Sequence, residues 1–138
     1  MRWPTLTEII ILYTYSVHPF SLNKSNSLKS NSEIDLVFKD GSKLSSKLIS
    51  LYYGKSDKGN SLRIAFSVGK KTHALATTRN KLKRLMKEAL RLNGREYLNY
   101  SLSYNLVFVY FSSKEESMKS IEESMKSLLL SFRNKKLS

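Results

Sequence analysis

The spacing of hydrophobic residues predicts three helices, and the most distinctive one spans residues 79–91. At about 100° per residue, its apolar side chains share one helical face. They are Leu82, Leu85, Met86, Ala89 and Leu90. Thr77 or Thr78 is expected to cap this helix, and Asn93 with Gly94 to end it. The apolar face can be buried against a core.

A shorter helix is expected upstream, at Glu33–Asp40. Asn31 and Ser32 both offer an N-cap, and Gly41 is expected to end the helix. The i, i+3, i+4 spacing gives this helix an apolar face as well. Its members are Ile34, Val37 and Phe38.

The last helix is expected after Ser112 or Ser113, each of which offers an N-cap. Its apolar side chains recur at helical spacing, which predicts a helix that packs on the core. They are Met118, Ile121, Met125, Leu128, Leu129 and Phe132. The pentapeptide Glu-Ser-Met-Lys-Ser occurs at 116–120 and again at 123–127, but two heptads are too few to indicate a coiled coil.

Two segments, Lys47–Gly54 and Leu62–Gly69, have the pattern of strands. The turn residues 56–60 between them predict a hairpin. The second strand alternates cleanly, so its side chains divide between two faces of the sheet. The apolar face holds Leu62, Ile64, Phe66 and Val68. The other face is small and polar and can stay open to a ligand, and it holds Arg63, Ala65, Ser67 and Gly69.

A third strand is expected at Asn105–Phe111, because its continuous apolar run is typical of a central buried strand. Another short strand is expected within Ser42–Lys47. Together these elements predict an α+β fold, in which a small mixed sheet is packed with about three helices. The predicted order along the chain is α-β-β-(β)-α-β-α.

The length of 138 residues predicts a single domain, which we place at 26–133 with a basic tail at 134–138. Residues 1–25 are expected to be a poorly ordered extension or to precede the true start. The apolar run Ile9–Tyr13 is too short to span a bilayer. Glu8 interrupts what would otherwise resemble a signal peptide, and no small-residue cleavage site is clear.

The chain carries a formal net charge of +13, with 24 Lys and Arg against 11 Asp and Glu. This balance favours a polyanionic partner, with nucleic acid ahead of an anionic membrane surface. The charge is concentrated around the predicted basic helix, where Glu88 is the one opposing residue between positions 70 and 95. The cations there are Lys70, Lys71, Arg79, Lys81, Lys83, Arg84, Lys87, Arg91 and Arg95.

No catalytic site is visible in the sequence. Cysteine is absent, which excludes disulfides and thiolate metal sites. His18 and His73 have no second ligand at metal-site spacing. The pairs Glu115-Glu116 and Glu122-Glu123 have the pattern of a solvated helix surface. Tyr52 is a better candidate for binding, because an exposed aromatic ring on a partly polar strand face could stack on an unpaired base, worth roughly 1–3 kcal/mol.

The basic helix and the strand before it resemble the protein subunit of bacterial ribonuclease P. The resemblance lies in Arg-Ile-Ala-Phe-Ser-Val-Gly-Lys-Lys at 63–71 and Arg-Asn-Lys-Leu-Lys-Arg-Leu-Met-Lys-Glu-Ala-Leu-Arg at 79–91. The family has a strand ending in Val-Ser-Lys-Lys and, after a loop, a helix that begins Arg-Asn-Arg. The similarity extends over roughly residues 26–132. Lys81 stands where the family usually has arginine, which keeps the charge but loses the planar, bidentate guanidinium.

The resemblance implies an accessory subunit of ribonuclease P, a cytoplasmic endonuclease that removes the 5′ leader of precursor tRNA. In that family the RNA performs catalysis with bound Mg²⁺, and the protein supplies neither a catalytic residue nor a metal site. The implied partners are ribonuclease P RNA and precursor tRNA, with no membrane and no protein partner. The resemblance also implies a left-handed β-α-β crossover, against the usual handedness rule.

The resemblance further implies two sets of RNA-binding residues. The leader would lie in a cleft between the first helix and the open sheet face, lined by Ile34, Phe38, Leu44, Tyr52 and Arg63. The catalytic RNA would contact Lys70, Lys71, Arg79, Asn80, Lys81, Lys83, Arg84, Lys87 and Arg91. Aromatic residues are common in the family where this chain has Ile34 and Leu44.

Three other functions remain open from the residues alone. A ribosome-associated structural RNA-binding protein would share this size and charge, and it would copurify with ribosomal particles. A helix-turn-helix DNA-binding module would need a short helix before residues 79–91, where a strand is predicted. A stand-alone nuclease would need a carboxylate cluster for metal-ion catalysis, which the sequence does not show.

Overall fold

The computed structural model describes residues 20, 22, 26–56, 61–99 and 102–137. The helices are α2 (Asn31–Asp40), α3 (Ala76–Asn93) and α4 (Met118–Leu137), and a 3₁₀ turn at Gly94–Glu96 follows α3. The strands are β1 (Ser42–Ser45), β2 (Ile49–Lys55), β3 (Arg63–Val68) and β4 (Tyr104–Tyr110). The predicted α+β fold is confirmed, including the short strand expected before β2. The predictions for the first 19 residues lie outside the described part of the chain.

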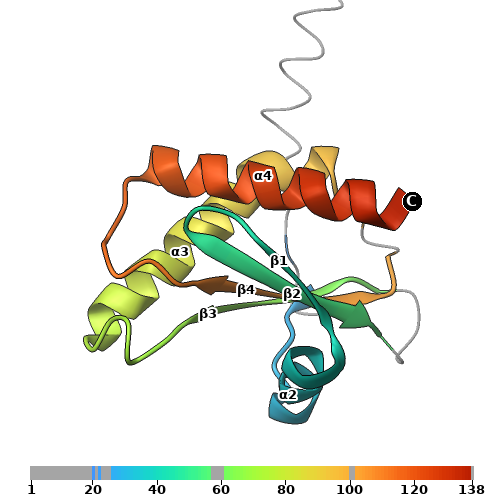
Figure 1. Cartoon of the computed structure of the whole chain (residues 1–138), viewed down its shortest axis with the longest axis horizontal. Coiled ribbons are helices and arrows are strands. Elements are labelled where there is room, and N and C mark those ends of the chain that lie inside the picture. The colour runs from blue at the N-terminus through green and yellow to red at the C-terminus, as the bar shows by residue number, and fades with distance from the viewer. Residues whose placement is uncertain (1–19, 21, 23–25, 57–60, 100–101, 138) are drawn as a thin grey trace, which may run out of the picture.

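The four strands form one mixed sheet in the order β1-β2-β4-β3. β2 pairs antiparallel with β1 and β4, whereas β3 and β4 are parallel. α3 and α4 cover one face of this sheet, and α2 lies against the other (Figure 1). The chain passes from β3 through α3 to the parallel strand β4, so the predicted crossover is present; its left-handedness stays a prediction.

The central position of β4 is confirmed, and it makes the predicted hairpin between β2 and β3 wrong. β4 lies between these two strands and pairs with both. Its residues from Asn105 to Phe108 are buried, as a strand with neighbours on both sides requires. Turn residues between β2 and β3 show only that the chain changes direction, and the hairpin that does form joins β1 to β2.

The main core lies between the sheet and the helix pair α3 and α4. Both predicted apolar helix faces are buried there, except that Leu85 and Met118 are partly exposed. Phe20 also belongs to this core, although it precedes the domain predicted from the sequence. Its N–H donates to the carbonyl of Arg91 at 3.0 Å, which satisfies a group in the last turn of α3. Gly94 leaves room for this contact, since an added Cβ would lie 3.1 Å from the ring of Phe20.

The helix caps differ from those predicted for α2 and α4. Ser30 caps α2, because its Oγ accepts the N–H of Glu33 at 3.4 Å. Ser117 takes this role at α4, where its Oγ accepts the N–H of Ser120 at 3.2 Å. Serine recurs before both helices, so the sequence offered several cap positions without distinguishing them. Gly41 ends α2 as predicted, and its N–H donates to the carbonyl of Val37 at 2.9 Å.

The start of α3 has no side-chain cap, and the predicted caps Thr77 and Thr78 lie inside its first turn. Arg79 stabilises this end in another way. Its Nη1 donates to the carbonyl oxygens of His73 and Ala74, at 3.0 and 2.7 Å. The arginine therefore holds the loop before α3 against the helix.

Ser124 joins α4 to the start of β2 and gives a test of the packing. Its Oγ accepts the buried N–H of Leu48 at 3.1 Å and is hydrogen-bonded to Ser46. We expect Ser124→Ala to lower the free energy of unfolding by about 1–3 kcal/mol, because the N–H of Leu48 loses its acceptor while buried. Urea denaturation measures this loss. Ser127→Ala, on the exposed side of the same helix, is the control and should change the free energy by less than about 0.5 kcal/mol.

Candidate nucleic-acid interface

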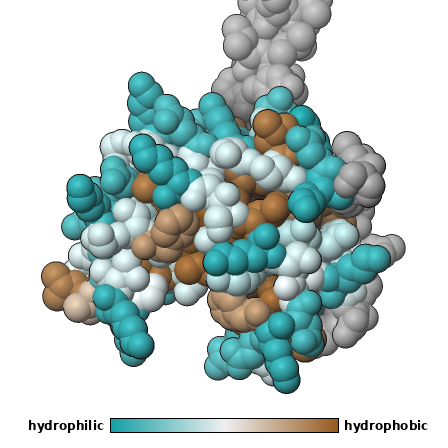
Figure 2. All heavy atoms as spheres, in the orientation of Figure 1, coloured by the Kyte–Doolittle hydropathy of each residue, from teal (hydrophilic) through white to brown (hydrophobic). Residues whose placement is uncertain are grey.

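α2 covers only part of its face of the sheet, and it leaves a mixed apolar and aromatic surface accessible. Val37 of α2 and Val107 of β4 are buried where the helix meets the sheet. Around them, partly buried side chains form what we call the α2 face: Ile34, Tyr52, Ala65 and Val109. Hydrophobic residues appear on the molecular surface above α2, with hydrophilic residues around them (Figure 2).

Two of the predicted leader-binding residues, Ile34 and Tyr52, belong to the α2 face, and a third, Phe38, packs against it. Tyr52 lies beside Phe38 with ring centroids 4.8 Å apart and the rings nearly perpendicular. Phe38 is 41% exposed, and Ile34 packs nearby against the same small cluster. The Nζ of Lys43 lies 5.4 Å from the centre of the Tyr52 ring. A half-exposed aromatic pair with a neighbouring cation has the chemistry that a single-stranded nucleic acid binds.

Arg63 reaches the same face but is already engaged. Its Nη1 lies 3.4 Å from Oε2 of Glu33 on α2, in a partly buried ion pair. Its Nε is buried and has no hydrogen-bond partner among the described residues, and the same holds for Oδ1 of Asn105, its neighbour on β4. Arg63 therefore holds α2 against β3 through the ion pair, and it also places a positive charge at this surface.

Leu44 does not belong to the α2 face, which corrects the predicted leader cleft. In the register of β1 and β2, Leu44 lies opposite Leu51, and Lys43 lies opposite Tyr52. Since side chains alternate along a strand, Leu44 points to the main core and Lys43 takes the place beside Tyr52.

The nine predicted contacts to the catalytic RNA separate into two groups along α3. Lys70 and Lys71 lie exposed in the turn after β3, close in sequence to the start of the helix. The exposed Asn80 and Lys81 follow in its first turns, and the Nζ of Lys81 lies 3.5 Å from Oε1 of Glu115. Arg79, also near this end, is committed to its loop carbonyls. The second group lies farther along the helix: Lys83, Arg84, Lys87 and Arg91.

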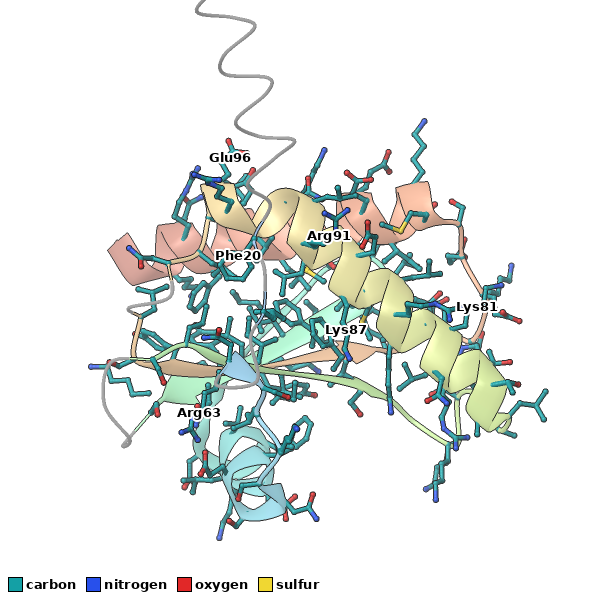
Figure 3. The ribbon with its side chains drawn as sticks, turned by 180° about the vertical axis from the view of Figure 1, so that it is seen from behind. Phe20, Arg63, Lys81, Lys87, Arg91 and Glu96 are labelled. Carbon is teal, nitrogen blue, oxygen red and sulfur yellow. The ribbon has the colours of Figure 1, made fainter. Side chains whose placement is uncertain are left out.

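This second group lines a groove of about 880 Å³, which we call the α3 groove. Its opposite wall comes from the N-terminal segment, including Phe20 and Lys29, and its floor from Ile64 and Phe66 of β3. Figure 3 shows Phe20, Lys87 and Arg91 near the same half of α3, with Lys81 toward the other end. The sequence did not predict this groove, because its walls come from three separate segments.

Glu88 and Arg91 form an ion pair within the groove. Nε and Nη2 of Arg91 donate to the two carboxylate oxygens of Glu88, at 2.9 and 2.5 Å. These hydrogen bonds lower the pKa of Glu88 below its ordinary value and raise the pKa of Arg91. Both groups therefore stay charged near neutral pH. Lys29, Lys83, Arg84 and Lys87 make no ion pair with any described residue, so they carry the net positive charge of the groove.

The described residues contain no group of three or more His, Cys, Asp or Glu side chains that could hold a metal ion. His73 is buried, and its Nε2 is hydrogen-bonded to the carbonyl of Ser112 at 2.8 Å, so it joins two loops. Within the same described part of the chain, no helix has the length and apolar character needed to cross a membrane.

Comparisons with known proteins show which family the chain resembles. The family model described as Ribonuclease P matches residues 22–133. The ribonuclease P protein component of Clostridioides difficile strain 630 is 37% identical over 108 residues, which are 78% of this chain and 91% of that protein. The corresponding protein of Alkaliphilus metalliredigens is 31% identical over 109 residues, covering 78% and 94%.

Solved structures show the same fold. The Staphylococcus aureus RNase P protein superposes with a TM-score of 0.67 at 21% identity, covering 79% of this chain and 96% of that one. The Thermotoga maritima protein superposes with a TM-score of 0.61 at 25% identity, covering 75% and 94%. From the family match and these relatives together, we conclude that the chain belongs to the ribonuclease P protein component family.

Proposed function

We propose that this chain binds the catalytic RNA of ribonuclease P and the 5′ leader of precursor tRNA, and so promotes removal of the leader. The observation that carries the proposal is the presence of two different surfaces on one small fold. One is the cationic end of α3 with the turn before it, and the other is the aromatic α2 face.

The first surface suits the backbone of a folded RNA. Lys70 and Lys71 are exposed and extend from a turn that Arg79 fastens to α3. Phosphate contacts of this kind give affinity without reading sequence, and they weaken as salt rises. A folded catalytic RNA can meet such a surface with several phosphates at once.

The second surface suits an unpaired strand of variable sequence. The ring of Tyr52 is half-buried beside Phe38, and Lys43 is placed to meet a phosphate. Stacking on aromatic rings tolerates any base, because every base has a π-face. Leaders of different precursor tRNAs differ in sequence, so this chemistry supports leader binding.

Bond cleavage is assigned to the RNA partner. The described residues present no carboxylate or histidine cluster with the donors that a Mg²⁺-assisted phosphodiester cleavage would need from protein side chains. The protein would instead raise the affinity for the precursor and offset repulsion between the two RNAs through its cationic residues.

Reconstitution tests the proposed function. The protein should increase cleavage of a precursor tRNA by its cognate catalytic RNA at low magnesium. Under that condition the cations in solution screen the phosphate charges of the two RNAs poorly. The rate of 5′-leader release, with and without protein, is the measurement. A rate equal to that of RNA alone would refute the proposal, and copurification with ribosomal particles would favour the ribosome-associated alternative.

A further inference from the structure

We propose that the α3 groove holds the part of the precursor's leader that extends beyond the α2 face. The second half of α3 would then contact the substrate, while the turn after β3 and the first turns of α3 contact the catalytic RNA. The inference rests on the proposed function and changes the assignment of Lys83, Arg84, Lys87 and Arg91.

The groove is continuous with the α2 face. Ile34 and Ala65 belong to the cluster around Tyr52, and both also line the groove. Leu28, buried in the same cluster, lines it as well. Ser27 and Leu28 pair with the outer edge of β3 at Ile64. A strand that lies on the α2 face can therefore pass over these two residues and enter the groove without leaving the protein surface.

The charge of the groove matches a nucleic-acid backbone. Among its described lining residues are five cations, Lys29, Lys83, Arg84, Lys87 and Arg91, and one carboxylate, Glu88. Glu88 is paired with Arg91, which leaves four cations for phosphates. A neutral apolar peptide would leave these cations without partners, whereas a phosphodiester strand supplies one negative charge per nucleotide.

The floor of the groove suits an unpaired base rather than a duplex. Phe66 is partly exposed, stacks on Phe108 with centroids 5.6 Å apart, and lies 6.0 Å from the Nζ of Lys87. The ring of Phe66 gives a base an apolar surface, with Lys87 beside it for the phosphate, whereas Ile64 beneath it is buried. A volume of about 880 Å³ admits a ligand of roughly one or two nucleotides and is too small for a helix of RNA.

The experiment uses the reconstituted holoenzyme and precursor tRNAs whose leaders increase in length one nucleotide at a time. Lys87→Gln removes one groove charge, and Phe66→Leu removes the ring but keeps an apolar side chain. Lys119→Gln, on the exposed surface of α4, removes the same charge away from the groove. Two dissociation constants are measured: holoenzyme for each precursor, and protein for the catalytic RNA alone. Urea denaturation of Phe66→Leu checks that it is folded.

With short leaders we expect both groove variants to bind like the wild type. With leaders long enough to pass the α2 face, wild-type affinity should rise, and each variant should bind about fivefold or more weakly than wild type. Affinity for the catalytic RNA alone should not change, and Lys119→Gln should match wild type throughout.

Two results would overturn the inference. If Lys87→Gln weakens binding of the catalytic RNA and its effect does not depend on leader length, the groove belongs to the catalytic RNA. If both variants match wild type with every leader, the groove binds neither RNA. Failure of the proposed function itself would look different, because the wild-type protein would then not stimulate cleavage of any precursor.

Discussion

Phe108→Ala is expected to lower the free energy of unfolding by about 3–5 kcal/mol, the largest stability effect that we anticipate. Phe108 lies in the middle of the central strand, is fully buried, and pairs with Leu51 on one side and Phe66 on the other. The substitution removes an aromatic side chain from a close-packed core, and the surrounding backbone cannot collapse into the cavity because it is held by two neighbouring strands.

Urea or guanidinium denaturation measures this effect, and Phe111→Ala is the matched control. Phe111 lies just past the end of β4 and is 45% exposed. Its truncation should change the free energy of unfolding by less than about 1 kcal/mol. Equal losses in the two variants would contradict the packing described for β4.

Replacing both Lys70 and Lys71 by glutamine is expected to weaken binding of the catalytic RNA by on the order of 30-fold at 0.15 M salt. Two lost phosphate contacts should also reduce the slope of log affinity against log salt by about 1.5–2. The difference in affinity between the variant and the wild type should shrink toward 1 M salt, because the two lost contacts contribute affinity by releasing counterions. Lys70 and Lys71 are suitable for this test because both are exposed and neither forms an ion pair with a described residue.

The control removes the same charge elsewhere, by Lys119→Gln together with Lys126→Gln on the exposed side of α4. This pair of changes should leave the slope almost unaltered. If the slope stays the same in the Lys70 and Lys71 variant, the turn after β3 lies away from the RNA. If both variants reduce it equally, binding follows net charge rather than a defined surface.

Much of the fold could be predicted because burial imposes regular spacing. The apolar faces of α3 and α4 are nearly those that a period of 3.6 residues indicates, and the continuous apolar run of β4 marks the central strand. Strand order was harder. Turn residues between β2 and β3 are compatible with two neighbouring strands or with two strands that have another strand between them. Only the order of the complete sheet distinguishes these arrangements.

Prediction of the candidate site from the sequence was limited in the same way. Tyr52, Phe38 and Ile34 could be placed together through the family resemblance, and they lie together because each is on the matching face of its own element. Leu44 could not be placed reliably, because a strand of four residues gives too few positions to establish its alternation. The α3 groove was unpredictable for a different reason, since its lining residues before α2 (20, 22 and 27–29), on β3 (64–66) and on α3 (between 83 and 91) meet only in the folded chain.

The sheet order has a consequence for how the chain folds during synthesis. β4 is the last strand to be made, yet it is the strand that joins β2 to β3. The strands made before it can pair as β1 and β2. β3 has only an isolated bridge to Ser27 and no partner strand until residues 104–110 are available. An isolated two-stranded hairpin is marginal in water. We therefore expect the complete sheet to form only after β4 has been made, by contacts far apart in sequence.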